Sequence, residues 1–329
     1  MTPLSVLDLV PVRQGGTVSQ ALAEAALLAQ AAEAAGYNRF WVAEHHATPG
    51  IAGGATSVVL AHVGAATSTI RIGSGGVMLP NHNPFVIAEQ FGTLEALFPG
   101  RVDLGLGRAP GAAGILAQAL RKDLHRAAEY FPQDVVELRA LFTGDLDLPI
   151  VATPGLGAQV ELWMLGSSLF GAQLAARLGL PYAFASHFAP DHLDAALAAY
   201  RSQFRPSDAL AAPYAMPAMT VICAETDEEA QTLASSQDQS FVRLRSGDPG
   251  TLPPPVPGYR DTLPLAAQAM LGRMEEARAV GSPATVREKI GRFAERTGAD
   301  EIIISGATFD PAARRHSLQL TMDALKAEA

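Results

Sequence analysis

Arg101-Val-Asp-Leu-Gly-Leu-Gly-Arg-Ala-Pro110 is the stretch that decides between the two α/β folds open to this chain. Its short apolar run leads into Gly105 and Gly107, as the fingerprint of an open, doubly wound sheet does. Arg108 and Pro110 then stand where a glycine-opened helix should begin. The fingerprint is therefore incomplete, and the stretch favours a closed (β/α)8 barrel.

The alternation of a short apolar run with a longer Ala-rich stretch recurs along the whole chain. The short runs predict parallel strands, and the stretches between them have the period of crossover helices. No linker-like break divides the chain, so we expect one barrel domain over residues 1–329. The predicted strands are residues 4–10, 39–43, 70–77, 102–106, 161–165, 182–186, 218–224 and 301–305. The predicted helices are residues 17–35, 84–97, 116–141, 169–178, 191–203, 227–236 and 285–297.

Length and composition agree with one large core. The 329 residues are 48% hydrophobic and 17% charged, which excludes a disordered or collagen-like chain. Lys and Arg number 24 against 33 Asp and Glu, and the resulting net charge of −9 repels phosphate backbones and anionic lipid. We therefore expect no binding to nucleic acid.

Two further features of the sequence bear on location. Cys223 is the single cysteine, so the chain can form neither an intramolecular disulfide nor a cysteine-cluster metal site, which suits a reducing compartment. No basic-then-apolar leader opens the sequence. No apolar stretch reaches the roughly 18 residues that a bilayer span needs. We expect a soluble, cytoplasmic protein without a membrane partner.

A proline-rich segment interrupts the alternation. Residues 246–264 contain six prolines, so they can form neither a strand nor a regular helix. The segment follows the seventh predicted strand, on the side of a barrel where active sites lie. We predict an insertion at about residues 245–282 that forms a mobile lid, with tolerated padding as the alternative.

Glu44, His45 and His46 stand at the exit of the second predicted strand. Adjacent side chains of an extended chain point to opposite faces, so both histidines can serve one site only if the backbone turns. We expect no metal site, because no third ligand has a suitable spacing. One hypothesis is a structural hydrogen bond between Glu44 and one histidine. The other makes His45 a catalytic proton donor or acceptor, since imidazole titrates near neutrality.

Ile72-Gly-Ser-Gly-Gly-Val-Met78 places three glycines in the third predicted strand. Glycine weakens a strand and often marks a bulge or a flat group that packs on the backbone. Three glycines within four residues at a strand exit predict a planar ring that packs on the main chain. Relief of crowding beside a helix would explain one glycine more easily than three.

Arg108 and a serine turn predict an anion site. Arg108 stands at the mouth of the fourth strand among small residues, where a guanidinium can clamp an anion, although an unpartnered surface arginine is the alternative. Gly166-Ser-Ser168 ends the fifth strand and opens a helix, whose first N–H groups and partial positive charge attract phosphate. An ordinary serine cap is the alternative there. Taken together, the two motifs favour a phosphate cradle.

Three more residues belong to the predicted mouth of the barrel. Met78 is expected in an apolar wall that faces the substrate. His187 follows the sixth predicted strand and either lines the pocket or caps it, and His82 lies past the third strand within reach of the mouth.

In this order and spacing, the motifs resemble the bacterial luciferase-like flavin monooxygenases, which are (β/α)8 barrels. The resemblance runs from residue 4 to residue 305 and is strongest between Phe40 and Gly111. It is closest to the branch related to alkanal monooxygenase.

The resemblance implies roles for individual residues. His45 matches the histidine that luciferases use in the chemistry of the oxygenated flavin. Gly75 and Gly76 match a pair joined by a cis peptide bond, against which the flavin ring rests. Arg108 matches the arginine that holds the flavin phosphate.

Five further residues lie at positions that contact the flavin in the family. Ser168 matches a serine of the phosphate cradle. Gly171 stands in place of a threonine, Ser167 in place of a glutamate, and Gly107 in place of the cysteine below the flavin. Gly166 belongs to the same turn. Because of these departures, the resemblance does not imply light emission.

The resemblance also implies an activity and partners. A separate flavin reductase would supply reduced FMN, and the barrel would use it with O2 to oxidise a small apolar substrate such as an aldehyde. Family analogy implies a homodimer. An F420-dependent oxidoreductase on the same barrel and a non-catalytic flavin-binding protein are the alternatives.

Overall fold

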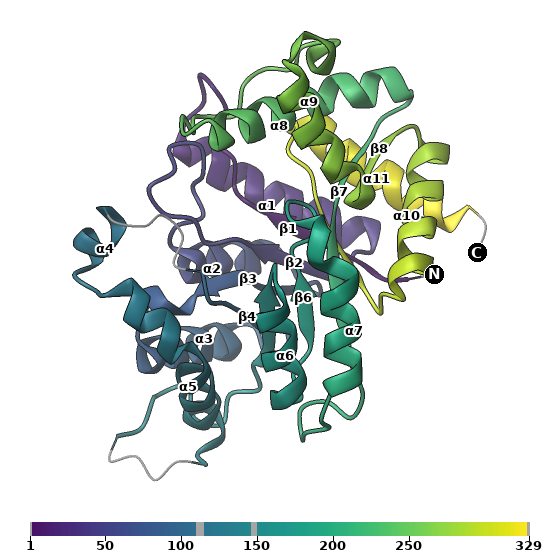
Figure 1. The fold of residues 1–329 in the computed structure, drawn as a ribbon. Coiled ribbons are helices and arrows are strands. Elements are labelled where there is room, and N and C mark those ends of the chain that lie inside the picture. The colour runs from purple at the N-terminus through teal and green to yellow at the C-terminus, as the bar shows by residue number, and fades with distance from the viewer. Residues whose placement is uncertain (1, 110–114, 146–149, 328–329) are drawn as a thin grey trace.

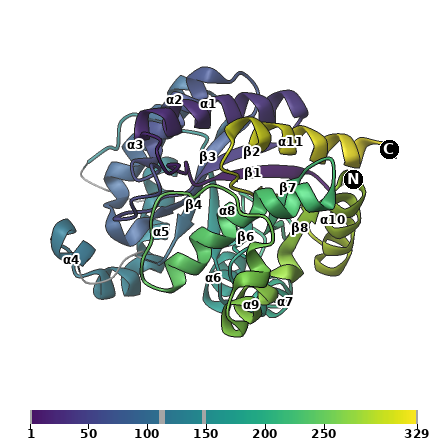
Figure 2. The ribbon, with the colours of Figure 1, turned by 90° about the horizontal axis from the view of Figure 1, so that it is seen from above.

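Eight parallel strands close into a barrel, and helices surround it (Figures 1 and 2). The computed structural model describes residues 2–109, 115–145 and 150–327. Within that part, β1 to β7 follow one another around the barrel, β7 pairs with β9, and β9 pairs with β1. The predicted (β/α)8 barrel is confirmed. The strands are β1 (Leu4–Asp8), β2 (Arg39–Val42), β3 (Arg71–Met78), β4 (Val102–Gly107), β5 (Glu161–Gly166), β6 (Tyr182–Phe184), β7 (Ala215–Cys223), β8 (Arg278–Gly281) and β9 (Ile302–Ser305).

A ninth strand, β8, lies outside this closure. Thr220 of β7 pairs with Ser305 of β9 on one side and with Arg278 of β8 on the other. The pairing of β6 with β7 ends at Pro217, so β8 continues the same edge of β7 beyond that point. The sequence analysis missed β8 because its four residues begin with a charged side chain and form no distinct apolar run.

Eleven α-helices lie in the described residues. The α-helices are α1 (Val18–Ala35), α2 (Thr56–Ala66), α3 (Pro84–Leu97), α4 (Ile115–Leu120), α5 (Leu124–Thr143), α6 (Leu169–Leu178), α7 (Leu193–Gln203), α8 (Asp227–Arg245), α9 (Leu265–Gly272), α10 (Pro283–Thr297) and α11 (Pro311–Lys326). The 3₁₀ helices are η1 (Leu79–Asn81), η2 (Pro190–His192), η3 (Tyr259–Thr262) and η4 (Arg273–Ala277). No helix in this part of the chain is long and apolar enough to cross a membrane.

Helix ends follow the local sequence where a capping signal is present. Thr17 and Gln20 form a capping box before α1, and Gly36 ends that helix with a positive φ of 93°. The prediction of one helix over residues 116–141 was wrong, because Arg121 has a positive φ of 55° and separates α4 from α5. The predictions also missed α2, whose N-cap residue Ala55 makes no side-chain cap.

The interior of the barrel has its own apolar core. Trp41 of β2 and Trp163 of β5 are fully buried, and their rings meet edge to face with centroids 5.2 Å apart. β2 and β5 are not neighbours in the sheet, so this contact crosses the interior. A second, larger core fills the space between the strands and the surrounding helices. The barrel is therefore packed through its centre.

A network of charges, which we call the Arg39 network, lies at the strand-start end of the barrel, with Arg39, Asp103 and Glu301 buried and the other members partly exposed. It consists of Arg39, Arg71, Asp103, Glu161 and Glu301, all at or beside the first residue of a strand. Arg39 donates to Asp103 at 2.9 Å and to Glu301 at 3.2 Å. Burial opposes the charge on Arg39, but the surrounding carboxylates outweigh it and raise the pKa of the guanidinium.

We expect Arg39→Met to destabilise the fold by about 3–5 kcal/mol, because the buried carboxylates of Asp103 and Glu301 lose a compensating charge. Urea unfolding measures the loss. Arg292→Met is the matched control, since Arg292 and its partner Glu288 are both exposed, and it should change stability by less than about 0.5 kcal/mol. Equal effects of the two substitutions would contradict the structural role of the Arg39 network.

Candidate functional site

The predicted site residues converge at the end of the barrel where the strands finish. His45 and His46 follow β2, while Gly75 and Gly76 lie near the end of β3. The remaining residues follow or end the next strands: Gly107 and Arg108 at β4, Gly166, Ser167 and Ser168 at β5, and His187 after β6. The carboxyl ends of parallel strands meet on one face of a barrel, which is where active sites of this fold lie.

The glycines of β3 are required by packing inside the barrel. A Cβ on Gly75 would lie 2.5 Å from Leu7 Cδ1, and a Cβ on Gly76 would lie 2.6 Å from the carbonyl oxygen of Gly105. The crowding therefore comes from other strands and not from a neighbouring helix, and it accounts for more than one glycine. The peptide bond between Gly75 and Gly76 is cis, which confirms the geometry implied by the resemblance.

Gly107 differs from these glycines. Among the described residues outside its immediate chain neighbours, a Cβ added there would come no closer than 3.7 Å, the nearest atom being the carbonyl oxygen of Val77. This position at the end of β4 thus has room for a side chain or for a bound group.

We expect Gly76→Ala to destabilise the fold by about 1–3 kcal/mol, because the nearest atom is backbone that cannot yield without moving β4. Gly107→Ala is the matched control on the neighbouring strand and should cost less than about 0.5 kcal/mol. Denaturant unfolding of both variants provides the comparison. A Gly76→Ala variant as stable as Gly107→Ala would contradict this packing.

Arg108 lies against the start of α6. Its guanidinium carbon is 3.9 Å from the centroid of the Phe170 ring, the second residue of that helix. Arg108 is exposed, and among the described residues no carboxylate forms an ion pair with it. The structure thus brings Arg108 and the serine turn together, as the sequence predicted, and leaves the guanidinium available.

The start of α6 also has unused hydrogen-bonding groups. Ser168 is the N-cap residue, and its side chain makes no capping bond. The first N–H groups of a helix have no partner within it, and here they lie beside Arg108. Gly171 packs close to the preceding turn, because a Cβ there would lie 3.3 Å from the Cα of Gly166. Ser168 thus occupies the cap position, but its side chain does not make the hydrogen bond of an ordinary serine cap.

His45 and His187 form a second group of unsatisfied atoms at the mouth. The Nδ1 atoms of both rings are buried without a hydrogen-bond partner. Burial lowers the pKa of His45, which Glu44 raises and His46 lowers further. Burial and the neighbouring His45 lower the pKa of His187 to about 4. Both imidazoles are therefore neutral at neutral pH, and each can accept or hand on a proton.

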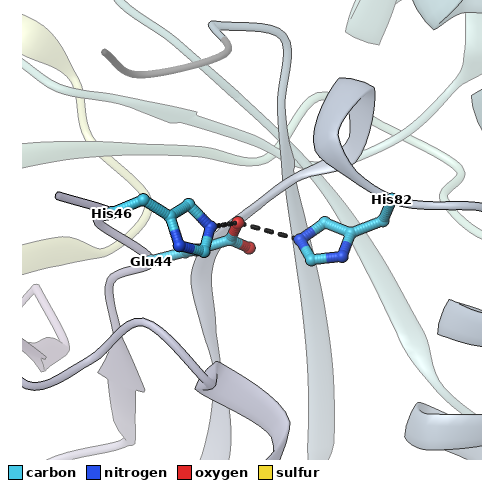
Figure 3. A group of neighbouring side chains, drawn as sticks. All are labelled: Glu44, His46 and His82. Carbon is cyan, nitrogen blue, oxygen red and sulfur yellow. Dashed lines mark hydrogen bonds and ion pairs between the residues drawn. The ribbon is translucent and has the colours of Figure 1, made fainter. Parts of the chain in front are cut away.

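Glu44 binds two histidines, of which the sequence analysis expected one. Its Oε1 lies 2.5 Å from His46 Nε2 and 2.8 Å from His82 Nε2 (Figure 3). Its Oε2 accepts the backbone N–H of Met78 at 3.0 Å. Burial opposes the charge, but the hydrogen bonds from His82, His46 and Met78 outweigh it and lower the pKa of Glu44. His45 does not join this group.

Spacing along the sequence offers no third ligand for a pair made of His45 and His46, whereas the structure groups His46 with Glu44 and His82 and leaves His45 out. His82 comes from the turn between β3 and α3, and β2 pairs directly with β3. Linear spacing cannot reveal a contact between residues 38 positions apart. The sequence could have indicated this contact in one way: consecutive strands of a barrel are usually neighbours, so residues that follow β2 and β3 are expected to lie close together.

The proline-rich segment lies against the exits of β1 and β2. Leu252 exchanges backbone hydrogen bonds with Val12 and Gln14, at 2.9 and 2.8 Å. Gly50 is pressed against Gly250, where a Cβ would lie 2.1 Å from the carbonyl oxygen. The segment follows α8 and not β7 itself, yet it lies on the predicted side of the barrel. Motion of this segment as a lid stays a prediction.

A family model for luciferase-like monooxygenases matches residues 2–301. The chain belongs to the luciferase-like monooxygenase family. A luciferase-like monooxygenase of Escherichia coli strain K12 is 47% identical over 320 residues, which cover 97% of this chain and 96% of the relative. An N-acetyl-S-alkylcysteine monooxygenase of Bacillus subtilis strain 168 is 35% identical over 75% of each chain. The structure of apo-MsnO8 superposes with a TM-score of 0.88 at 35% identity, over 99% of each chain.

Two more distant solved structures share the fold alone. The oxygenating constituent of 3,6-diketocamphane monooxygenase from Pseudomonas putida, in complex with FMN, has a TM-score of 0.70 at 19% identity over 97% of this chain and 96% of its own. An F420-dependent secondary alcohol dehydrogenase has a TM-score of 0.72 at 16% identity over 99% of both chains. The family is one of monooxygenases, so this chain is placed among oxidoreductases, and its neighbours carry cofactors of the flavin type.

Proposed function

We propose that this protein is the oxygenase component of a two-component, FMN-dependent monooxygenase, which uses reduced FMN from a separate reductase and O2 to oxidise a small apolar substrate. The observation that carries the proposal is the position of Arg108. Its guanidinium has no carboxylate partner in the described residues and lies against the uncapped start of α6. A phosphate monoester is the anion that suits a guanidinium beside helix N–H groups.

The residues present fit FMN. Arg108 and the N–H groups after Ser168 would hold the phosphate, with hydroxyl donors from Ser167 and Ser168. Gly107 leaves room at the end of β4, and Gly75 and Gly76 present bare backbone on the adjacent strand. FMN, when bound and reduced, supplies the electrons that activate O2.

The chain's own part in the reaction is to position the reactants and to control protons. His45 lies at the exit of β2 with a buried, unpaired Nδ1, so this atom is free to give or take a proton at the reacting group. His187, whose Nδ1 is also unpaired, lies close enough to His45 for His45 to lower the pKa of His187. We propose that His187 and Met78 border the substrate, and that the proline-rich segment over the exits of β1 and β2 excludes water.

Arg108→Met should weaken FMN binding about 10- to 100-fold, because a charge-assisted hydrogen bond contributes about 1.5–3 kcal/mol. Fluorescence titration with FMN measures the change. Arg296→Met is the control, since its guanidinium also lies over a phenylalanine ring, at 5.5 Å, but on α10 at the strand-start end of the barrel. A wild-type protein that fails to bind FMN, or an equal loss in both variants, would reject the cradle.

His45→Gln should keep FMN affinity and lose about 10²- to 10⁴-fold in turnover, as expected for removal of a general acid or base. The measurement is substrate-dependent O2 uptake with reduced FMN, screened over small carbonyl and sulfur compounds. The sulfur compounds are included because a relative is named an N-acetyl-S-alkylcysteine monooxygenase. Tight binding of F420 without O2 uptake would favour an F420-dependent oxidoreductase. FMN binding with no O2 uptake over the screen would favour a non-catalytic flavin-binding protein.

A further inference from the structure

Three metal-ligating side chains converge at the exits of β2 and β3 (Figure 3). The proposed phosphate cradle lies at the exits of the next two strands, β4 and β5. Glu44, His46 and His82 each place one ligand atom within 4.8 Å of the others. The two imidazoles lie on opposite sides of the carboxylate, with ring centroids 6.4 Å apart. We call this group the Glu44 cluster.

Glu44 differs from most buried carboxylates of this protein in the side chains that neutralise its charge. Glu44 is 2% exposed and pairs with no arginine or lysine in the described residues. Glu95, which is slightly more exposed than Glu44, accepts a hydrogen bond from the backbone N–H of Gly100. The other four buried carboxylates each pair with an arginine: Asp8, Asp103, Asp238 and Glu301. A buried anion is stable only when it is paired and hydrogen-bonded. Glu44 meets this condition through two histidines and the Met78 N–H, and because both histidine nitrogens are metal-ligating atoms, the Glu44 cluster can also take a cation from outside the chain.

We propose that the Glu44 cluster binds a divalent transition-metal cation of the zinc type. Two imidazoles and one carboxylate form a ligand set that zinc accepts while one position stays open for water. The Oε2 of Glu44 is held by the Met78 N–H, which leaves Oε1 to face both histidines. The side chains of His46 and His82 are 22% and 30% exposed, so a cation has a route from solvent.

Small movements convert the hydrogen-bonded cluster into a coordination site. Tetrahedral zinc with bonds of about 2.0–2.1 Å holds its ligand atoms about 3.3 Å apart. The present separations from Glu44 Oε1 are 2.5 and 2.8 Å, so each of these two pairs must open by less than about 1 Å. The two histidine nitrogens lie within 4.8 Å of each other and must settle at the same spacing of about 3.3 Å. Coordination through Nε2 requires that this nitrogen carries no proton, so each imidazole keeps its single proton on Nδ1 in the metal-bound form.

The backbone that carries the ligands is anchored. The carbonyl oxygen of His82 accepts a hydrogen bond from Lys122 Nζ. The carbonyl oxygen of His46 accepts one from Thr48 Oγ1 at 3.2 Å. These bonds limit the movement of the two loops, so the donor atoms stay directed at one point.

The test is a Co²⁺ titration of the full-length protein after treatment with a chelator and without flavin, so it does not depend on the proposed function. Visible d–d absorption reports the coordination, and equilibrium dialysis counts the bound ions. We expect one ion per chain with Glu44, His46 and His82 intact. Zn²⁺ should displace Co²⁺ and abolish the absorption.

Variants assign the site. His82→Ala should weaken Co²⁺ binding at least about tenfold, and His46→Ala should do the same from the other side of the carboxylate. His316→Ala is the matched control, because His316 also faces a glutamate, Glu225 at 3.1 Å, but in an exposed pair without a third ligand. Binding should be unchanged in that variant.

Three results would overturn the proposal: wild-type protein that binds no more Co²⁺ than His82→Ala, an equal loss in His316→Ala, or an absorption spectrum unaltered by removal of either histidine. Each would leave the Glu44 cluster as a closed hydrogen-bond network in which a histidine carries the balancing charge. Circular dichroism of each variant separates loss of a ligand from loss of the fold. FMN binding is measured separately, so failure of one proposal does not affect the other.

Discussion

The indole of Trp41 is the feature on which the interior of the barrel depends. It is fully buried, meets Trp163 across the barrel and donates its Nε1–H to Asp103 at 2.9 Å. Its bulk also leaves no room for a Cβ on Gly73, where the indole nitrogen would lie 2.6 Å away. One side chain thus excludes a Cβ at Gly73 and orients a carboxylate of the Arg39 network. Because interiors are close-packed, these choices are not independent.

Polar side chains at the two ends of the barrel differ in whether they have partners within the chain. At the strand-start end, the buried charges of the Arg39 network are paired with one another. At the strand exits, the described residues supply no partner for the Nδ1 atoms of His45 and His187 and no carboxylate for Arg108. A buried imidazole nitrogen without a partner reduces stability, so two of them at the strand exits fit a functional site there.

The two proposals use neighbouring but distinct parts of the mouth. The proposed phosphate cradle is built at the exits of β4 and β5, where Arg108 meets the start of α6. The Glu44 cluster is built at the exits of β2 and β3. Met78 links them, since its backbone N–H holds Glu44 and its residue pairs with Gly107 in the sheet. A change at one site can therefore reach the other through β3.

The sequence by itself determined the eight barrel strands and the residues at their exits, because apolar periodicity, glycine placement and the serine turn are local signals. It also indicated that Arg108 and the turn before α6 belong together. Only the tertiary structure decided that His82 joins Glu44 and His46, that β8 extends β7 outside the barrel, and that the glycines of β3 relieve crowding from other strands. These facts depend on contacts between residues distant along the chain, and such contacts leave no periodic or spacing pattern in the sequence.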